Sequence, residues 1–120
     1  MNGEQKKKLE AKSSIGKTVW FKDKKTGKHI RQGIVEDEVY ILVSDYKHLI
    51  QRIRCPEGAA WSGNKLGYWD GSHFGYRTGY YTFDKYGRNI VWGQFTQFLT
   101  EREYQKLLAK AREKGWPIFP

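Results

Sequence analysis

GKTVWFKDKKTGKHIRQGIVEDEVYILVSDYKHLIQRIRC, residues 16–55, is the stretch of sequence that decides the fold. It alternates runs of β-branched and aromatic residues with short polar segments, a pattern typical of strands joined by tight turns. The expected strands are Thr18–Phe21, Ile30–Val35, Val39–Ser44 and His48–Cys55, and the expected turns contain Thr26-Gly27 and Glu36-Asp37-Glu38. Four short strands of this kind predict a small curled sheet or barrel.

The second half of the chain predicts a further hairpin. Tyr76–Phe83 leads into the polar segment Asp84–Gly87, and the chain returns as Asn89–Phe95. A loop of four or five residues with glycine near its end suits a type I turn followed by a left-handed residue. We therefore expect Gly87 to adopt a positive φ.

A helix is expected after this hairpin. Thr100 is a suitable N-cap, and Glu103 three positions later completes a capping box. Gly115 provides the left-handed residue that commonly ends a helix. One face of this helix carries apolar residues that must pack on the sheet, namely Tyr104, Leu107, Leu108 and Ala111.

The opening strands resemble those of the SH3-like small β-barrels. The resemblance covers about residues 15–55 and is carried by Gly16-Lys17-Thr18-Val19-Trp20-Phe21, Thr26-Gly27-Lys28, Gly33-Ile34-Val35 and a strand ending near Asp45-Tyr46. In many such barrels a basic turn after the first strand leads into a strand with a small residue at a bend. The resemblance implies a fold and no particular activity.

Taken together, these patterns predict one α+β domain over residues 15–120. We expect a strongly twisted or barrel-like antiparallel sheet with a C-terminal helix packed on it. Residues 1–14 are rich in Lys and Glu and contain only Leu9 and Ala11 to bury. They are expected to form a flexible basic segment or a marginal helix.

Charge and cysteine content narrow the functional classes. Twenty-two Lys and Arg against 13 Asp and Glu give a net charge of +9 over 120 residues, which favours polyanionic partners. The single cysteine, Cys55, excludes an internal disulfide and a cysteine-rich zinc site. The sequence shows no secretory signal pattern and no apolar run long enough to span a membrane. We therefore expect a cytoplasmic protein without a membrane partner.

The most unusual feature is a glycine at every fourth position, at Gly63, Gly67, Gly71, Gly75 and Gly79. Wherever this block is extended, its glycines share one face with the residues two positions away, which are Lys65, Trp69, His73, Arg77 and Tyr81. A turn at Asp70-Gly71 would separate Trp69 from His73 and Arg77. Either surface is compatible with the pattern, and so is a mainly structural aromatic core in which the glycines serve turns and close packing.

Cations beside aromatic side chains are the parts that nucleic-acid binding requires. We expect a small non-catalytic module that binds RNA or DNA through a basic, aromatic and glycine-rich β-surface. The candidate contact residues are Arg77, His73, Trp69, Tyr81, Lys65, Lys22, Lys24, Lys25, Lys28, Arg52 and Arg54. The alternative is a protein-interaction domain that binds an extended peptide or another copy of itself.

Catalysis is not expected. Asp70 with His73, and Cys55 with His48, are the only pairs that suggest a general base or a nucleophile. The three histidines lack metal-ligand spacing, and no phosphate-binding glycine loop is present. We therefore expect no metal and no cofactor.

Overall fold

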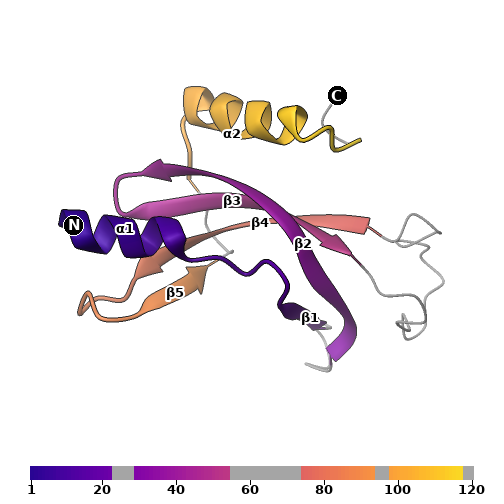
Figure 1. Cartoon of the computed structure of the whole chain (residues 1–120), viewed down its shortest axis with the longest axis horizontal. Coiled ribbons are helices and arrows are strands. Elements are labelled where there is room, and N and C mark those ends of the chain that lie inside the picture. Colours follow the sequence, from indigo (N-terminus) through magenta and orange to yellow (C-terminus); the bar gives the residue numbers. More distant parts are fainter. Residues whose placement is uncertain (23–28, 55–73, 94–97, 118–120) are drawn as a thin grey trace. The chain divides into compact units, whose positions relative to one another are not determined.

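The computed structural model describes residues 1–22, 29–54, 74–93 and 98–117. Figure 1 shows their elements along the chain. These elements are α1 (Gly3–Ala11), β1 (Thr18–Lys22), β2 (His29–Val43), β3 (Tyr46–Arg54), β4 (Phe74–Phe83), β5 (Ile90–Gly93) and α2 (Glu101–Glu113). The strands form one sheet in the order β1-β2-β3-β4-β5.

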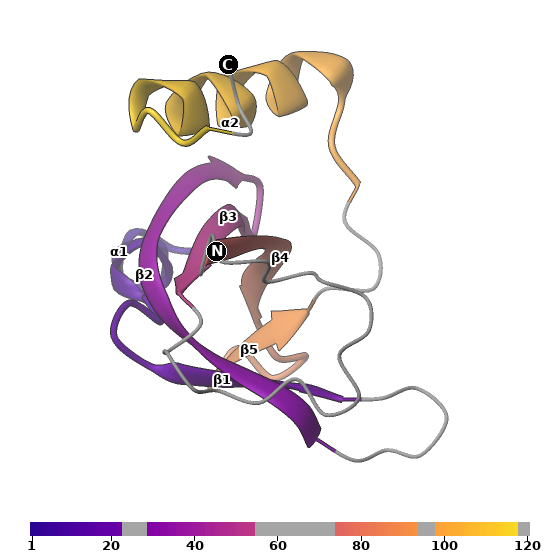
Figure 2. The same cartoon turned by 90° about the vertical axis from the view of Figure 1, so that its right-hand side faces the viewer.

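The predicted fold class is confirmed. The chain is α+β, and its antiparallel sheet is strongly curled (Figure 2) and accompanied by the C-terminal helix α2. This architecture is compatible with the barrel-like fold that the opening strands indicated. Contacts within the chain group it into two compact units. The first contains Met1–Ser13, Val39–Ile50 and Thr78–Pro120, and the second contains Ser14–Glu38 and Gln51–Arg77.

In the first unit, α1 and α2 lie on opposite faces of the sheet. Leu9 of α1 is fully buried and clusters with Leu49 and Tyr81. Glu103 of α2 instead lines a pocket with His48. Neighbouring residues of a strand point to opposite faces of the sheet. Because α1 packs on the Leu49 side and α2 lies on the His48 side, the two helices are on different sides of β3.

Helix α1 begins and ends with specific polar contacts. Asn2 and Gln5 form a capping box, in which the Asn2 side chain accepts the Gln5 backbone N–H at 2.8 Å. At the other end, the Nζ of buried Lys47 donates to the carbonyls of Glu10 at 2.7 Å and Lys12 at 2.6 Å. A lysine at this position satisfies carbonyl groups that have no partner within the helix.

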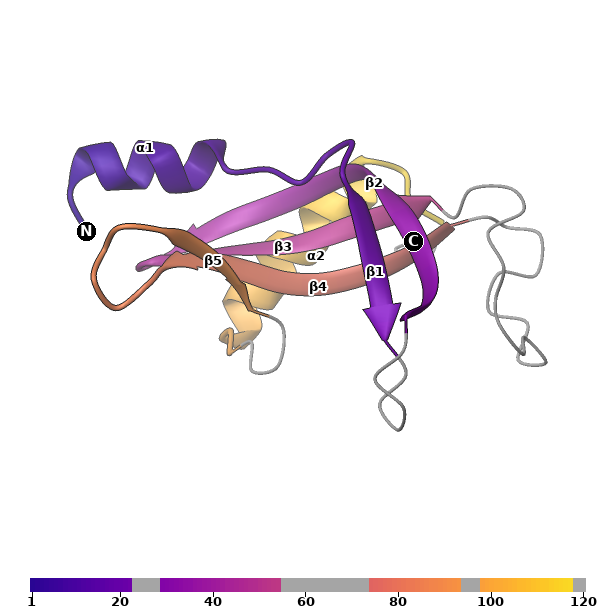
Figure 3. The same cartoon turned by 90° about the horizontal axis from the view of Figure 1, so that it is seen from below.

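The hairpin of β4 and β5 confirms the predicted turn (Figure 3). Phe83 pairs with Ile90, and Gly87 has the expected positive φ of 69°. Asp84 organises the turn because its Oδ1 accepts the backbone N–H groups of Tyr86 at 3.1 Å and Arg88 at 3.0 Å. These hydrogen bonds lower the pKa of the Asp84 carboxyl group.

The predicted C-terminal helix is also confirmed. The Thr100 side chain accepts the Glu103 N–H, and the Glu103 carboxylate accepts the Thr100 N–H at 2.9 Å. Of the apolar residues expected to pack on the sheet, Leu107 and Ala111 are buried and Leu108 is half-buried, but Tyr104 is exposed. Gly115 has a φ of 74°.

In the second unit, one sequence prediction is wrong. Glu36, Asp37 and Glu38 were expected to form a turn, but they lie inside the continuous strand β2. Cross-strand partners on β3 explain why these acids are tolerated in a strand: Arg52 pairs with Glu36 at 3.3 Å, and Gln51 donates to Glu38 at 3.0 Å.

Candidate functional site

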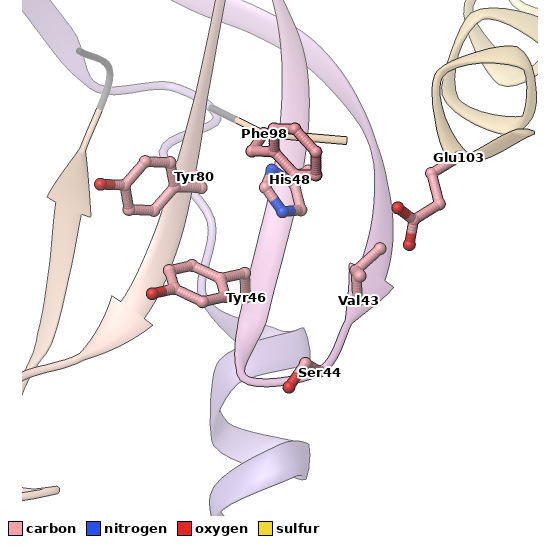
Figure 4. Close-up of a pocket in the computed structure, with 7 residues that line it drawn as sticks. All are labelled: Val43, Ser44, Tyr46, His48, Tyr80, Phe98 and Glu103. Carbon is pink, nitrogen blue, oxygen red and sulfur yellow. The ribbon is translucent and has the colours of Figure 1, made fainter. Parts of the chain in front are cut away.

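The first unit contains an open pocket of about 420 Å³ (Figure 4). Its volume lies within the range usual for small-ligand sites. The lining residues come from the end of β2, the β2–β3 connection, β3, β4, the segment before α2 and α2 itself, and they are Val43, Ser44, Tyr46, His48, Tyr80, Phe98 and Glu103. None of these residues is a lysine or an arginine. The described lining is therefore suited to an uncharged group rather than to a phosphate.

Aromatic rings form most of the pocket wall. Tyr46 and His48 are two positions apart on β3 and share a face, with their rings stacked at a centroid distance of 5.8 Å. Tyr80 on β4 meets Tyr46 edge-on at 5.3 Å. Phe98, 82% exposed, adds a further ring just before α2 (Figure 4). Tyr46 and Phe98 are exposed and can stack on a flat ligand, whereas His48 is buried at 4% exposure.

Two ionisable groups complete the pocket. Burial lowers the pKa of His48, and the neighbouring Glu103 carboxylate only partly offsets this effect. Hydrogen bonds from Thr100 lower the pKa of Glu103, so Glu103 is ionised at neutral pH. Figure 4 shows the carboxylate directed from α2 toward the pocket. The pocket thus presents a neutral imidazole and a hydrogen-bond-accepting carboxylate to a ligand.

The structure brings some of the sequence-predicted contact residues into internal contacts. Tyr81 is 4% exposed and belongs to the core cluster with Leu9, so its ring is not accessible to a ligand. Arg77 donates from Nε to Gln51 at 2.6 Å. Arg52 pairs with Glu36, and its guanidinium lies 3.8 Å from the centre of the Phe74 ring. Both arginines therefore make contacts within the second unit.

The other predicted contact residues are placed only in part. Arg54 is exposed at the end of β3. Lys22 pairs through its backbone with His29, and its side chain lies outside the described part of the structure. The remaining candidates lie outside the described residues, as do Asp70 and Cys55; they are Lys24, Lys25, Lys28, Lys65, Trp69 and His73.

Gly79 shows what one glycine of the four-residue period does. It lies opposite β5, and a Cβ added at this position would collide with the indole of Trp92. The Trp92 ring also meets Tyr81 edge-on at 5.1 Å. Gly79 therefore serves close aromatic packing on the core face, in agreement with the structural interpretation of the block at this position.

Sequence reasoning missed the pocket. The alternation of Tyr46 with His48 was a usable signal, because residues two apart on a strand share a face. Tyr80 and Phe98 are distant in sequence from that pair, and Glu103 was recognised only as a capping residue. Their assembly into one pocket depends on strand pairing and on the position of α2.

No protein-family model, no curated protein and no solved structure matches this chain. Within the described residues, no group of three His, Cys, Asp or Glu side chains is arranged to hold a metal ion. The described helices include none that is both long enough and apolar enough to cross a membrane.

Proposed function

We propose that this chain is a small non-catalytic nucleic-acid-binding module that stacks a base in its aromatic pocket. The observation that carries the proposal is an open pocket walled by Tyr46, Tyr80 and Phe98 in a chain with a net charge of +9. Stacking on aromatic rings and attraction of phosphates by cations are the two terms of single-strand binding. The pocket supplies the first term, and the charge of the chain supplies the second.

Cations outside the pocket attract the phosphates. Arg102 and Lys106 are exposed on α2 on either side of Glu103 in sequence, and Lys106 is close enough for its charge to lower the pKa of Glu103. Exposed Arg54 adds to the positive field, and the lysines of residues 22–28 remain predicted contributors.

We also propose that residues 15–55 form an SH3-like arrangement and that the protein acts in the cytoplasm.

Salt dependence tests the proposal directly. Fluorescence anisotropy with labelled single- and double-stranded oligonucleotides should show affinity that falls steeply between 50 and 200 mM salt. Absence of binding to any oligonucleotide at 50 mM salt would refute the proposal.

A matched pair of variants tests the role of the pocket. Tyr46→Ala should weaken binding by about 5- to 150-fold, because one stacked base contributes about 1–3 kcal/mol. Tyr86→Ala removes an exposed tyrosine outside the pocket and serves as the control. Equal oligonucleotide affinities for the two variants would show that the pocket does not take part in binding.

A second candidate function is self-association through a sheet edge. In the described part of the sheet, β5 is the terminal strand after β4, and Val91 on it is 43% exposed. An exposed strand edge can pair with another chain. Light scattering across a concentration series tests this function: a dimer that Val91→Lys dissociates would support it, and a monomer at all concentrations would exclude it.

A further inference from the structure

We infer that the pocket selects an unpaired base that carries an exocyclic amino group, with Glu103 as the acceptor. This inference rests on the proposed function and deepens it. It names both the form of the nucleic acid, a single strand, and the chemistry that distinguishes the preferred bases: adenine, cytosine and guanine carry an exocyclic amino group, whereas uracil and thymine carry none.

Stacking in this pocket requires a base with a free ring face, which a base inside a duplex lacks. Tyr46, His48 and Tyr80 form one continuous aromatic wall, since each ring centroid lies within 6.0 Å of the other two. A base pair within a duplex has both faces covered by its neighbours, so its ring cannot lie against this wall. Single strands, loops and ends present the free faces that such stacking uses.

The polar groups determine which base edge fits. Oε1 of Glu103 already accepts the backbone N–H of Thr100 at 2.9 Å. We expect Oε2 to accept a hydrogen bond from the base. A carboxylate accepts from the amino group of cytosine or adenine, whereas the carbonyl oxygen of uracil or thymine at the corresponding position would face it with repulsion.

Cytosine and uracil provide the sharpest comparison because they differ at position 4 by an amino group against a carbonyl oxygen. Anisotropy titrations with oligocytidine and oligouridine of equal length, at pH 7.5 and one salt concentration, measure the preference. We expect cytidine to bind about tenfold more tightly, which corresponds to one discriminating hydrogen bond. Oligomers of deoxycytidine and thymidine repeat the comparison for DNA.

Glu103→Gln is the decisive variant. Its Oε1 can continue to accept the Thr100 N–H, so the capping box is retained while the group offered to the base becomes an N–H donor. The cytidine preference should disappear or reverse. Glu101→Gln is the matched control, because it removes the same charge from the same first turn of α2 at a residue that does not line the pocket.

The outcomes separate this inference from the proposed function. A tenfold cytidine preference that Glu103→Gln abolishes and Glu101→Gln retains supports the inference. Equal, salt-dependent binding of both oligomers overturns it and leaves the proposed function standing, whereas no binding overturns both. A preference that persists in Glu103→Gln also overturns it. Cytidine monophosphate that binds as tightly as the oligomer would identify a free-nucleotide site and contradict strand binding.

Discussion

Replacing Lys47 by Met should detach the C-terminal end of α1 from the sheet. The Lys47 side chain is among the largest that are fully buried, and its Nζ donates to two carbonyls at 2.7 and 2.6 Å. The same Nζ lies 4.3 Å from the centre of the Tyr40 ring, whose hydroxyl donates to Glu10 at 2.9 Å. One side chain of β3 thus makes two hydrogen bonds to the C-terminal end of α1 and a cation–π contact with Tyr40 of β2.

The magnitude follows from the groups that lose their partner. Each carbonyl left without a hydrogen bond costs about 1–3 kcal/mol of folding stability. The variant no longer has to bury a charged ammonium group, and this gain offsets part of the cost. We expect a net loss of about 2–3 kcal/mol, which lowers Tm by roughly 8–12 °C for a domain of this size. Methionine has a similar length and can fill the same buried space, so the substitution removes mainly the ammonium group.

Thermal unfolding followed by circular dichroism, with hydrogen exchange of the α1 amides, measures the effect. Lys7→Met is the control, because Lys7 lies on the exposed surface of α1. It should change Tm by less than about 2 °C. A Lys47→Met protein with wild-type Tm and unchanged protection of α1 would show that this lysine does not anchor the helix.

Three further changes test other parts of the structure. Gly79→Ala should cost about 2–3 kcal/mol in urea unfolding because its Cβ collides with Trp92, and adding Trp92→Leu should restore part of that loss; an unchanged midpoint for Gly79→Ala would contradict the packing. Thr100→Ala should cost about 1 kcal/mol by thermal unfolding through the lost N-cap, while Thr100→Ser should retain most of the stability. Burial lowers the pKa of His48, so the unfolded chain takes up its proton first, near pH 6.5, and the stability contributed by neutral His48 is lost as pH falls below that value. Urea unfolding at pH 7.5 and 5.5 should show a larger loss for the wild type than for His48→Gln, and equal losses would refute the assignment.

Local patterns predicted the elements whose signals lie within a few residues of one another. The turn before Gly87 and the capping box at Thr100 depend on backbone geometry and short-range hydrogen bonds, and both are present. The turn predicted from the acidic run at residues 36–38 was wrong because the partners of these acids are distant in sequence. Arg52 and Gln51 stabilise Glu36 and Glu38 across the sheet, which no local pattern reveals.

The four-residue glycine period was only partly interpretable for the same reason. The alternation correctly predicts that Gly79 and Tyr81 share a face, since both lie on β4. Which face is exposed depends on what covers it. The packing of Leu9 beside Tyr81 and of Trp92 over Gly79 makes this a core face, and both covering residues come from other elements.

Glu103 takes part in two features of the candidate site. One is the capping box with Thr100, which the local sequence predicts, and the other is the pocket, which depends on where α2 lies on the sheet. Its capping hydrogen bond with Thr100 fixes one carboxylate oxygen and thereby restricts the direction of the other. Because α2 lies on the His48 face of β3, the same restriction aims the carboxylate at the aromatic pocket. Under the proposed function, a residue whose sequence context indicates only helix capping therefore acquires a second role from the position of its helix. In that proposal the capping box keeps the acceptor in place before a ligand arrives, which would reduce the ordering cost of binding.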